Sequence, residues 1–421
     1  MNRRRTQRWV AAGAALLAST TLAACGNSSD GSSASGGNVT LSYALWDPNQ
    51  APAMKQIAAA FEKKNPGIHV DVQITPGQQF FTKLQTAVTA GNAPDVFWTD
   101  PIFFQMYAAN GALKAQDGAG VDTSKFPDQL VSLCQSGGKL YGVPKDFDTI
   151  GVWYNKSLFD AAGVAYPKDD WTWADFQSAA AKLTDKGKGI FGTAAELNNQ
   201  QTYYNTIYQA GGSVLNADKT ASTYTAPETV QGLKFWTDLV DKGYSPSIQQ
   251  MTDTSPMDMF QTGKVAMVWE GSWNVKPLSE SPVKDHIDVA ALPRGAKQAT
   301  MINGLCNVVS ATTKHPAAAE KFLTFLGSEA AQRIQGESGT VIPAYNGTQK
   351  SWVDAYPKYH VQAYVDQVPS GVPMPVTANT FDWMQNEPTI LGKAWAGQVS
   401  VDDAAAQMAK TIDDSIAKNK G

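Results

Sequence analysis

The sequence predicts an α/β protein with two lobes. Strand-like and helix-like segments alternate in residues 39–100, and they alternate again in residues 172–273. Between them, residues 139–155 read as two short strands with a break in the middle. Alternation of this kind is typical of open sheets with helices on their faces. We therefore expect two α/β lobes facing a cleft, with the chain crossing from one to the other within residues 139–155.

The first lobe is predicted from alternating apolar patterns at its start. Residues 39–46 and 68–74 alternate with period two, as strands do, while residues 52–64 place four apolar side chains on one helical face. The tripeptide Asn65-Pro66-Gly67 ends that helix. A second helix over 79–90 and a strand over 96–98 follow, and an open parallel sheet is expected.

The crossing carries two carboxylates. Residues 140–143 and 150–154 are β-branched and aromatic runs, and Pro144 ends the first of them because it removes a ladder donor. The connection between them holds Asp146 and Asp148. These acids are expected to line the floor of the cleft.

The second lobe is predicted from helix starts and short apolar runs. Thr172 and Thr225 each open a capping box, for helices reaching about residues 183 and 242, and Ser400 opens another before residues 401–417. The other elements expected in this lobe are strands over 190–195 and 264–269 and helices over 203–210 and 388–395. Near Pro293 the chain changes character, and a strand over 303–310 and a helix over 316–326 are expected there.

The charge balance excludes one class of partner. The 421 residues carry a formal net charge of −4, and the first 24 contain four arginines and no acid. The remaining 30 basic and 38 acidic residues give −8. Because phosphate binding needs a basic surface, we expect no nucleic-acid partner.

The N-terminus predicts export and a lipid anchor. Arginines precede an apolar stretch at residues 9–17, which is short for a bilayer span of about 20 residues and typical of a signal peptide. The run Leu22-Ala23-Ala24-Cys25 resembles the lipobox of bacterial lipoproteins, so Cys25 is expected to be lipidated after removal of residues 1–24. The alternative is a plain signal peptide with a chance cysteine. Residues 25–38 form a polar tether. The chain is thus expected on the outer face of the cytoplasmic membrane, by an export route left open.

Two cysteines remain after the anchor. Cys134 and Cys306 would lie in an oxidising compartment, where a pair of cysteines can form a disulfide. Two buried thiols are the alternative.

Several short motifs follow one another in a distinctive order. They are the lipobox, Ala-Pro-Asp-Val-Phe-Trp, Lys-Leu-Tyr-Gly-Val-Pro before Trp-Tyr-Asn-Lys, Thr-Trp-Ala-Asp-Phe, Gly-Lys-Val-Ala-Met before Gly-Ser-Trp, and Ala-Ala-Glu-Lys-Phe-Leu-Thr-Phe-Leu. Their order resembles that of extracellular solute-binding proteins, the family that includes the maltose-binding protein. The resemblance implies a two-lobed periplasmic-binding-protein-like fold of type II, with lobes 39–146 plus 294–340 and 147–293 plus 341–421. It implies a monomer that captures a mono- or oligosaccharide for the permease of an ABC importer, without catalysis or a cofactor.

A sugar ring has C–H faces, on which aromatic rings stack, and a rim of hydroxyl groups, which carboxylates and amides bind. The chain has side chains of both kinds near predicted strand ends, where ligands bind in α/β sheets. The resemblance carries sugar contacts onto Asp148, Trp273 and Trp383, and less directly onto Trp98 and Asp100. Core packing is the alternative for each tryptophan, yet Trp383→Ala is expected to weaken binding with little change in melting temperature. The full predicted set is Trp46, Asp47, Trp98, Asp100, Asp146, Asp148, Tyr203, Glu270, Trp273, Asn303 and Trp383.

Other functions find less support. Residues 187–192 have the spacing of a dinucleotide loop, but they follow a helix and enter a strand, the reverse of the required order. The four histidines are scattered singly, so no metal site is predicted. A polyamine would suit carboxylates and aromatics nearly as well as a sugar. A glycerol phosphate compound, a metal chelate and a secreted glycosidase remain as weaker alternatives.

Overall fold

The structure of the chain is a computed structural model that describes residues 38–116, 118 and 120–418. The predicted signal peptide, Cys25 and the tether up to residue 37 lie outside this range. Within the described residues, no helix combines the length and the apolar character that a membrane crossing requires.

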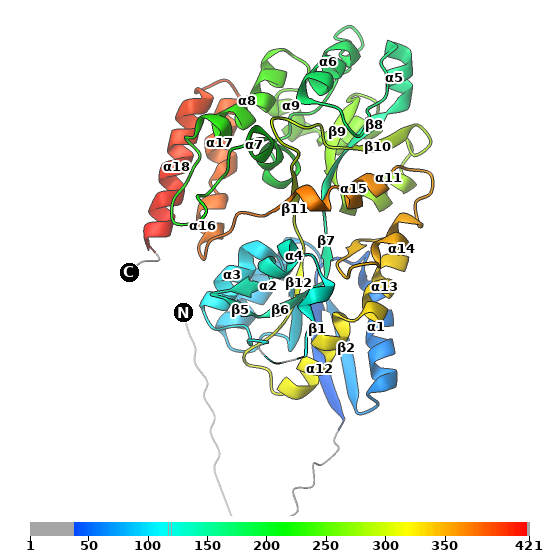
Figure 1. The fold of residues 1–421 in the computed structure, drawn as a ribbon, viewed down its shortest axis with the longest axis vertical. Coiled ribbons are helices and arrows are strands. Elements are labelled where there is room, and N and C mark those ends of the chain that lie inside the picture. Colours follow the sequence, from blue (N-terminus) through cyan, green and yellow to red (C-terminus); the bar gives the residue numbers. More distant parts are fainter. Residues whose placement is uncertain (1–37, 117, 119, 419–421) are drawn as a thin grey trace, which may run out of the picture. The chain divides into compact units, whose positions relative to one another are not determined.

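The first sheet has five strands in the order β2-β1-β3-β12-β6 (Figure 1). Their bounds are β1 Val39–Leu45, β2 Ile68–Ile74, β3 Val96–Thr99, β6 Gly142–Pro144 and β12 Cys306–Val309. β1 pairs in parallel with β2 and β3, as predicted. β12 runs antiparallel to both β3 and β6. The sheet is therefore mixed, because its fourth strand enters late in the sequence, after the chain has returned from the second sheet.

The helices packed around this sheet bury apolar faces. In α1, the predicted side chains Met54, Ile57, Ala58 and Phe61 are all buried. The elements of this region are α1 Ala51–Lys64, α2 Gln78–Thr89, α3 Pro101–Ala109, η1 Thr123–Lys125, α4 Asp128–Leu133, β4 Gln135–Ser136, β5 Lys139–Leu140, α12 Pro316–Leu326, α13 Glu329–Glu337 and α14 Gln349–Val353.

The second sheet is antiparallel, in the order β10-β8-β9. Its strands are β8 Ile150–Asn155, β9 Met267–Gly271 and β10 Ile287–Ala291, and all six residues of β8 are buried. The strand predicted over 190–195 is wrong, since only isolated bridges form at Ile190 and Phe191. The following amides at Thr193 and Ala195 donate instead to a loop carbonyl and a serine hydroxyl, so no ladder continues.

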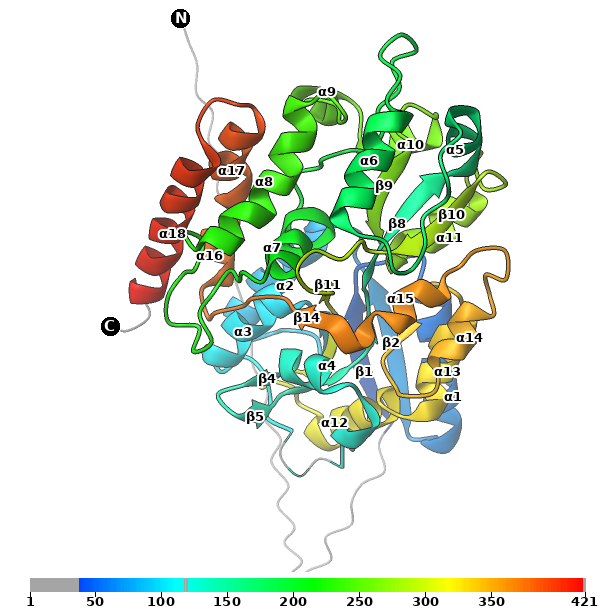
Figure 2. The same ribbon diagram turned by 45° about the horizontal axis from the view of Figure 1, so that its top comes forward.

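Helices dominate the rest of this region (Figure 2). Thr172 forms the predicted capping box, and Ser400 accepts the amide of Asp403 at a helix start. The box predicted at Thr225 is wrong: Ala226 precedes the helix without a side-chain cap, and Pro227 supplies the fixed φ of its first turn. The elements are α5 Lys156–Ala162, α6 Trp173–Leu183, the π-helix η2 Asn199–Tyr203, α7 Tyr204–Ala210, α8 Pro227–Asp241, α9 Ile248–Asp253, α10 Pro256–Gln261, η3 Ser272–Asn274, α11 Val275–Glu280, α15 Gln362–Asp366, η4 Val368–Ser370, α16 Thr380–Met384, α17 Glu387–Trp395 and α18 Val401–Lys418.

Short strand pairs join the two sheets. The predicted crossing is confirmed, since β6 belongs to the first sheet and β8 to the second. Between them, β7 (Asp146–Phe147) pairs with β13 (Ile342–Pro343), and β11 (Thr300–Ile302) pairs with β14 (Gly371–Pro373). An isolated bridge joins Asp148 to Asn303. Separate passages of the chain thus meet where the two sheets are connected.

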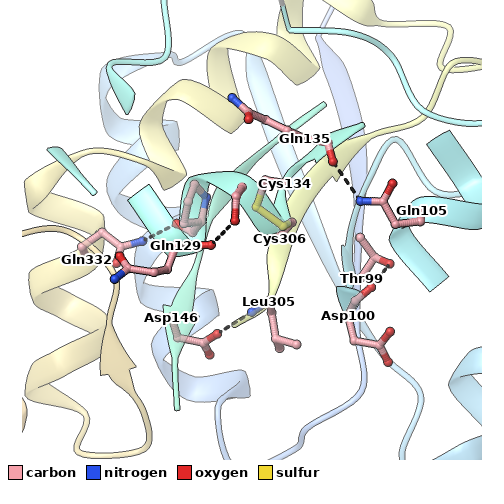
Figure 3. Close-up of a disulfide and its surroundings, with 12 residues drawn as sticks. Thr99, Asp100, Gln105, Gln129, Cys134, Gln135, Asp146, Leu305, Cys306 and Gln332 are labelled. Atoms are coloured by element: carbon pink, nitrogen blue, oxygen red, sulfur yellow. Dashed lines mark hydrogen bonds between the residues drawn. A yellow bond between two sulfur atoms is a disulfide. The ribbon is translucent and has the colours of Figure 1, made fainter. Parts of the chain in front are cut away.

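Cys134 and Cys306 form a disulfide with a Cα–Cα distance of 5.8 Å (Figure 3). It joins the end of α4 to the start of β12 across 172 residues of sequence. The alternative of two buried thiols is thereby excluded. A cross-link over so long a loop stabilises the fold by at most about 5 kcal/mol in the chain-entropy model.

Candidate ligand-binding site

Five residues, four of them predicted and one neighbouring, lie in or next to the crossings. We call Asp148, Glu270, Ser272, Trp273 and Asn303 the crossing cluster. The Asp148 amide donates to the Asn303 carbonyl at 2.7 Å, and the Ser272 hydroxyl donates to Asp148 Oδ1 at 2.8 Å. Burial, followed by the negative charge of Asp146, raises the pKa of Asp148 to about 7. The cluster brings together the first crossing, the end of β9 and the return crossing.

Glu270 supplies a second buried carboxylate to the crossing cluster. Its Oε2 accepts hydrogen bonds from Gln201 Nε2 at 2.5 Å and from Asn274 Nδ2 at 2.6 Å. Burial and the charge of Glu196 raise the pKa of Glu270 to about 8. Glu270 is only 3% exposed, and its carboxylate holds the side-chain amides of Gln201 and Asn274 in place.

Asn303 has an unused acceptor. Its Nδ2 donates to Gln200 Oε1 at 3.2 Å, while its Oδ1 is buried and has no hydrogen-bond partner among the described residues. A buried oxygen without a donor costs about 1–3 kcal/mol. A ligand hydroxyl arriving at this position would remove that cost.

Trp273 presents a half-buried ring at the end of β9. The ring folds back over Gly271, where an added Cβ would lie 1.9 Å from Trp273 Cζ3. The ring can approach the backbone this closely only because residue 271 is a glycine. Of the predicted tryptophans, Trp273 and Trp46 keep partly exposed rings.

Asp146 differs from Asp148 because it is already paired. Its Oδ2 accepts from Lys145 Nζ, and its Oδ1 accepts from the Leu305 amide at 3.2 Å (Figure 3). Lys145 Nζ also donates to Gln50 Oε1 at 2.6 Å and lies 4.1 Å from the centre of the Trp98 ring. The two charged side chains are 1% and 3% exposed, so this ion pair belongs to the interior.

A row of aromatic rings runs from the end of β1 to α16. We call Trp46, Phe81, Phe103 and Phe381 the aromatic row. Adjacent ring centres lie 5.2, 5.1 and 5.4 Å apart in that order. The first three rings are half-buried, and Phe381 is 46% exposed. Because α16 packs on α3, the row spans elements of both regions (Figure 2).

The predicted ligand residues included one end of the aromatic row, Trp46, and left out Phe81, Phe103 and Phe381. A signal was present, since the first turns of α2 and α3 each contain two consecutive phenylalanines, at positions 80–81 and 103–104. Phe80 and Phe104 are buried in the core, and the other ring of each pair, Phe81 or Phe103, is half-buried. Beside Trp46, the predicted Asp47 accepts from the Asn49 amide at 2.9 Å and so stabilises the turn before α1.

Two predicted tryptophans are core residues in this structure. Trp98 is 0% exposed and donates to the Tyr43 hydroxyl at 2.6 Å. Trp383 is also 0% exposed and donates to Thr377 Oγ1 at 3.1 Å. The expectation that their rings face a ligand is therefore corrected: packing against the two cores leaves neither ring a free surface.

Asp100 and Tyr203 also have structural partners. Asp100 caps α3, accepting from the amides of Ile102 and Phe103, and burial raises its pKa to about 6. Tyr203 is 2% exposed and donates to Glu387 Oε2 at 2.9 Å. The Tyr203 hydroxyl is thus bound to Glu387, and the cap of α3 occupies Oδ1 of Asp100.

One cavity lies where the two regions approach each other. It has a volume of about 410 Å³ and is lined from α3 and the α4–β5 turn on one side and from residues 219–220 and 376–378 on the other. None of the predicted ligand residues lines it. It is therefore distinct from the crossing cluster.

The acids of the crossing cluster do not form a metal site. Across the part of the chain that the structure describes, no three His, Cys, Asp or Glu side chains gather as ligands. What the cluster offers instead is acceptors and amide donors at the crossings. Flat rings are supplied separately, by the aromatic row.

Comparison with known proteins places these observations in a family. A family model described as bacterial extracellular solute-binding protein matches residues 47–333. The maltodextrin-binding protein MdxE of Bacillus subtilis is 26% identical over 414 residues, which covers 94% of this chain and 94% of that protein. The maltooligosaccharide ABC transporter solute-binding lipoprotein of Streptococcus pneumoniae serotype 4 is 25% identical and covers 97% of each chain.

Among solved structures, the chain is similar to the ABC substrate-binding protein Lmo0181 from Listeria monocytogenes in complex with cycloalternan. The TM-score is 0.82 at 29% sequence identity, and the match covers 90% of this chain and 99% of that chain. The predicted two-lobed α/β fold is thereby confirmed.

Proposed function

Because the chain belongs to the bacterial extracellular solute-binding proteins, we propose that it captures a carbohydrate and delivers it to an ABC importer without cleaving it. The ligand lies between the lobes, which correspond to residues 39–146 plus 294–340 and 147–293 plus 341–421. Closure of the lobes about the crossings retains it.

The aromatic row is the observation that carries this proposal. Its half-buried rings and the 46% exposed Phe381 offer apolar faces of the kind that pack on the C–H faces of sugar rings. Asp148 and the unpaired Asn303 Oδ1 supply acceptors for hydroxyl groups. Relatives named for maltodextrin and maltooligosaccharide binding support an oligosaccharide built of glucose units.

The test is a thermal-shift screen of the domain that starts after Cys25. The panel holds maltotriose, larger maltooligosaccharides, monosaccharides and polyamines, and tryptophan fluorescence titration follows each positive result. A ligand that binds only the folded state raises the melting temperature. Stabilisation by a saccharide that is recovered unchanged supports the proposal. Stabilisation by polyamines alone, or consumption of the saccharide, would overturn it.

Phe381→Ala is expected to weaken saccharide binding about tenfold, which corresponds to the loss of one ring stacking on the ligand. The melting temperature without ligand should change little, because the ring is 46% exposed. Titration of tryptophan fluorescence measures the affinity. Tyr166→Ala is the matched control, since Tyr166 is 41% exposed but lies on the α5–α6 connection. An unchanged affinity in Phe381→Ala would remove this ring from the site.

The lipid anchor forms a separate part of the proposal. Leu22-Ala23-Ala24-Cys25 directs lipidation of Cys25, which holds the domain at the outer face of the cytoplasmic membrane. Cys25→Ser is expected to move the protein from the membrane fraction to the medium, as measured by fractionation and immunoblotting. Retention of the variant in the membrane would contradict lipidation at this cysteine.

A further inference from the structure

The buried carboxylate of Glu387 has no part in the proposed contacts with the ligand. Glu387 is the first residue of α17, is 1% exposed, and forms no ion pair with any described lysine, arginine or histidine. A buried charge of this kind must be held by hydrogen bonds or by a helix N-terminus.

Four side chains donate to Glu387. Its Oε2 accepts from Asn199 Nδ2 and from the Tyr203 hydroxyl, each at 2.9 Å. Its Oε1 accepts from the hydroxyls of Tyr204 and Tyr224, each at 2.6 Å. Three of these donors come from residues 199–204, so the carboxylate is bound mainly to one short segment of chain.

That segment is the π-helical turn η2. Successive turns of a π-helix are closed by i→i+5 hydrogen bonds, here from the Tyr204 amide to the Asn199 carbonyl. This wide turn places Asn199, Tyr203 and Tyr204 on the side that faces Glu387. Single π-helical turns are rare in proteins, and those that occur often lie at functional sites.

Two other residues of the turn, Gln200 and Gln201, reach the crossings instead. Gln200 Oε1 accepts from Asn303 Nδ2 at 3.2 Å, and Gln201 Nε2 donates to Glu270 Oε2 at 2.5 Å. Both partners belong to the crossing cluster. The turn therefore connects Glu387 on one side with that cluster on the other.

We propose that Glu387 is a positioning residue: by holding the π-helical turn, it fixes the amides of Gln200 and Gln201 in the ligand site without touching the ligand. This inference rests on the proposed function for its effect on binding. Its effect on the turn can be measured without any ligand.

The first experiment compares Glu387→Met with Glu387→Gln. Methionine keeps the approximate length of the side chain but accepts no strong hydrogen bond, so amide hydrogen exchange in residues 198–205 should rise at least tenfold and affinity for maltotriose should fall at least tenfold. Glutamine should restore most of the slow exchange and most of the affinity. Its oxygen can accept from Asn199 and Tyr203, while its nitrogen donates to the hydroxyls of Tyr204 and Tyr224. Slow exchange or unchanged affinity in Glu387→Met would overturn the inference.

A matched pair of variants distinguishes a local effect on the turn from a general loss of stability. Tyr204→Phe and Tyr224→Phe each remove one hydroxyl at 2.6 Å from the same oxygen, but only Tyr204 adjoins the turn. Similar losses of melting temperature are expected, with faster exchange and at least threefold weaker maltotriose binding for Tyr204→Phe alone. Equal weakening by Tyr224→Phe would contradict a role through the turn. If the wild-type protein binds no saccharide of the panel, the proposed function fails, and the exchange rates still decide whether Glu387 holds the turn.

Discussion

Lys145→Met is expected to lower the free energy of unfolding by about 3–5 kcal/mol, the usual cost of leaving one member of a buried ion pair without its partner. Lys145 and Asp146 lie in the first crossing and are almost inaccessible to solvent. Methionine fills a similar volume but leaves the Asp146 carboxylate with the Leu305 amide as its remaining donor. Urea denaturation at neutral pH measures the loss.

The same substitution also removes two other contacts of the ammonium group. Gln50 Oε1 loses its donor at the start of α1, and the ring of Trp98 loses a cation at 4.1 Å. Because the positive charge of Lys145 lowers the pKa of Asp148, that pKa should rise further in the variant. The consequences should therefore reach the crossing cluster as well as the core.

Two controls separate charge from packing in this experiment. In Lys145→Met/Asp146→Asn the uncompensated charge is gone, so a large part of the stability should return. Lys350→Met breaks an exposed pair with Asp354, in which the side chains are 79% and 59% exposed, and should leave the midpoint unchanged. A Lys145→Met midpoint no lower than that of Lys350→Met would refute the interior ion pair.

Trp383→Ala is expected to cost about 3–5 kcal/mol of stability, the range for truncating a buried tryptophan. The ring is 0% exposed in the core of the second region and donates to Thr377 Oγ1. This result would replace the expectation from sequence that the substitution leaves the melting temperature nearly unchanged. Calorimetry of the domain without ligand provides the measurement.

Phe381→Ala is the internal comparison, because Phe381 lies two residues earlier in the same helix and is 46% exposed. It should leave the melting temperature close to that of the wild type and act on saccharide affinity instead. A Trp383→Ala protein as stable as wild type would show that the ring does not support the core, and would return Trp383 to the set of ligand residues.

Local patterns in the sequence determined most of the elements. Period-two alternation predicted β1 and β2, and the apolar face of α1 is buried as expected. The short run between residues 140 and 154 predicted that the chain passes from one sheet to the other, because a proline and a polar segment interrupt two apolar strands there. These features depend on residues that are close together in the sequence, so they can be predicted without the tertiary structure.

Tertiary structure decided the properties that depend on distant partners. The sequence left the bond between Cys134 and Cys306 open, since 172 residues separate them and only their approach in the fold joins them. It equally could not distinguish the buried Trp383 from the exposed Phe381 in one helix. Burial is set by which elements pack against each face of α16, and nothing in five residues specifies that packing. The sequence therefore identified which residue types could form the site, while the packing of remote segments determined which of them face a ligand.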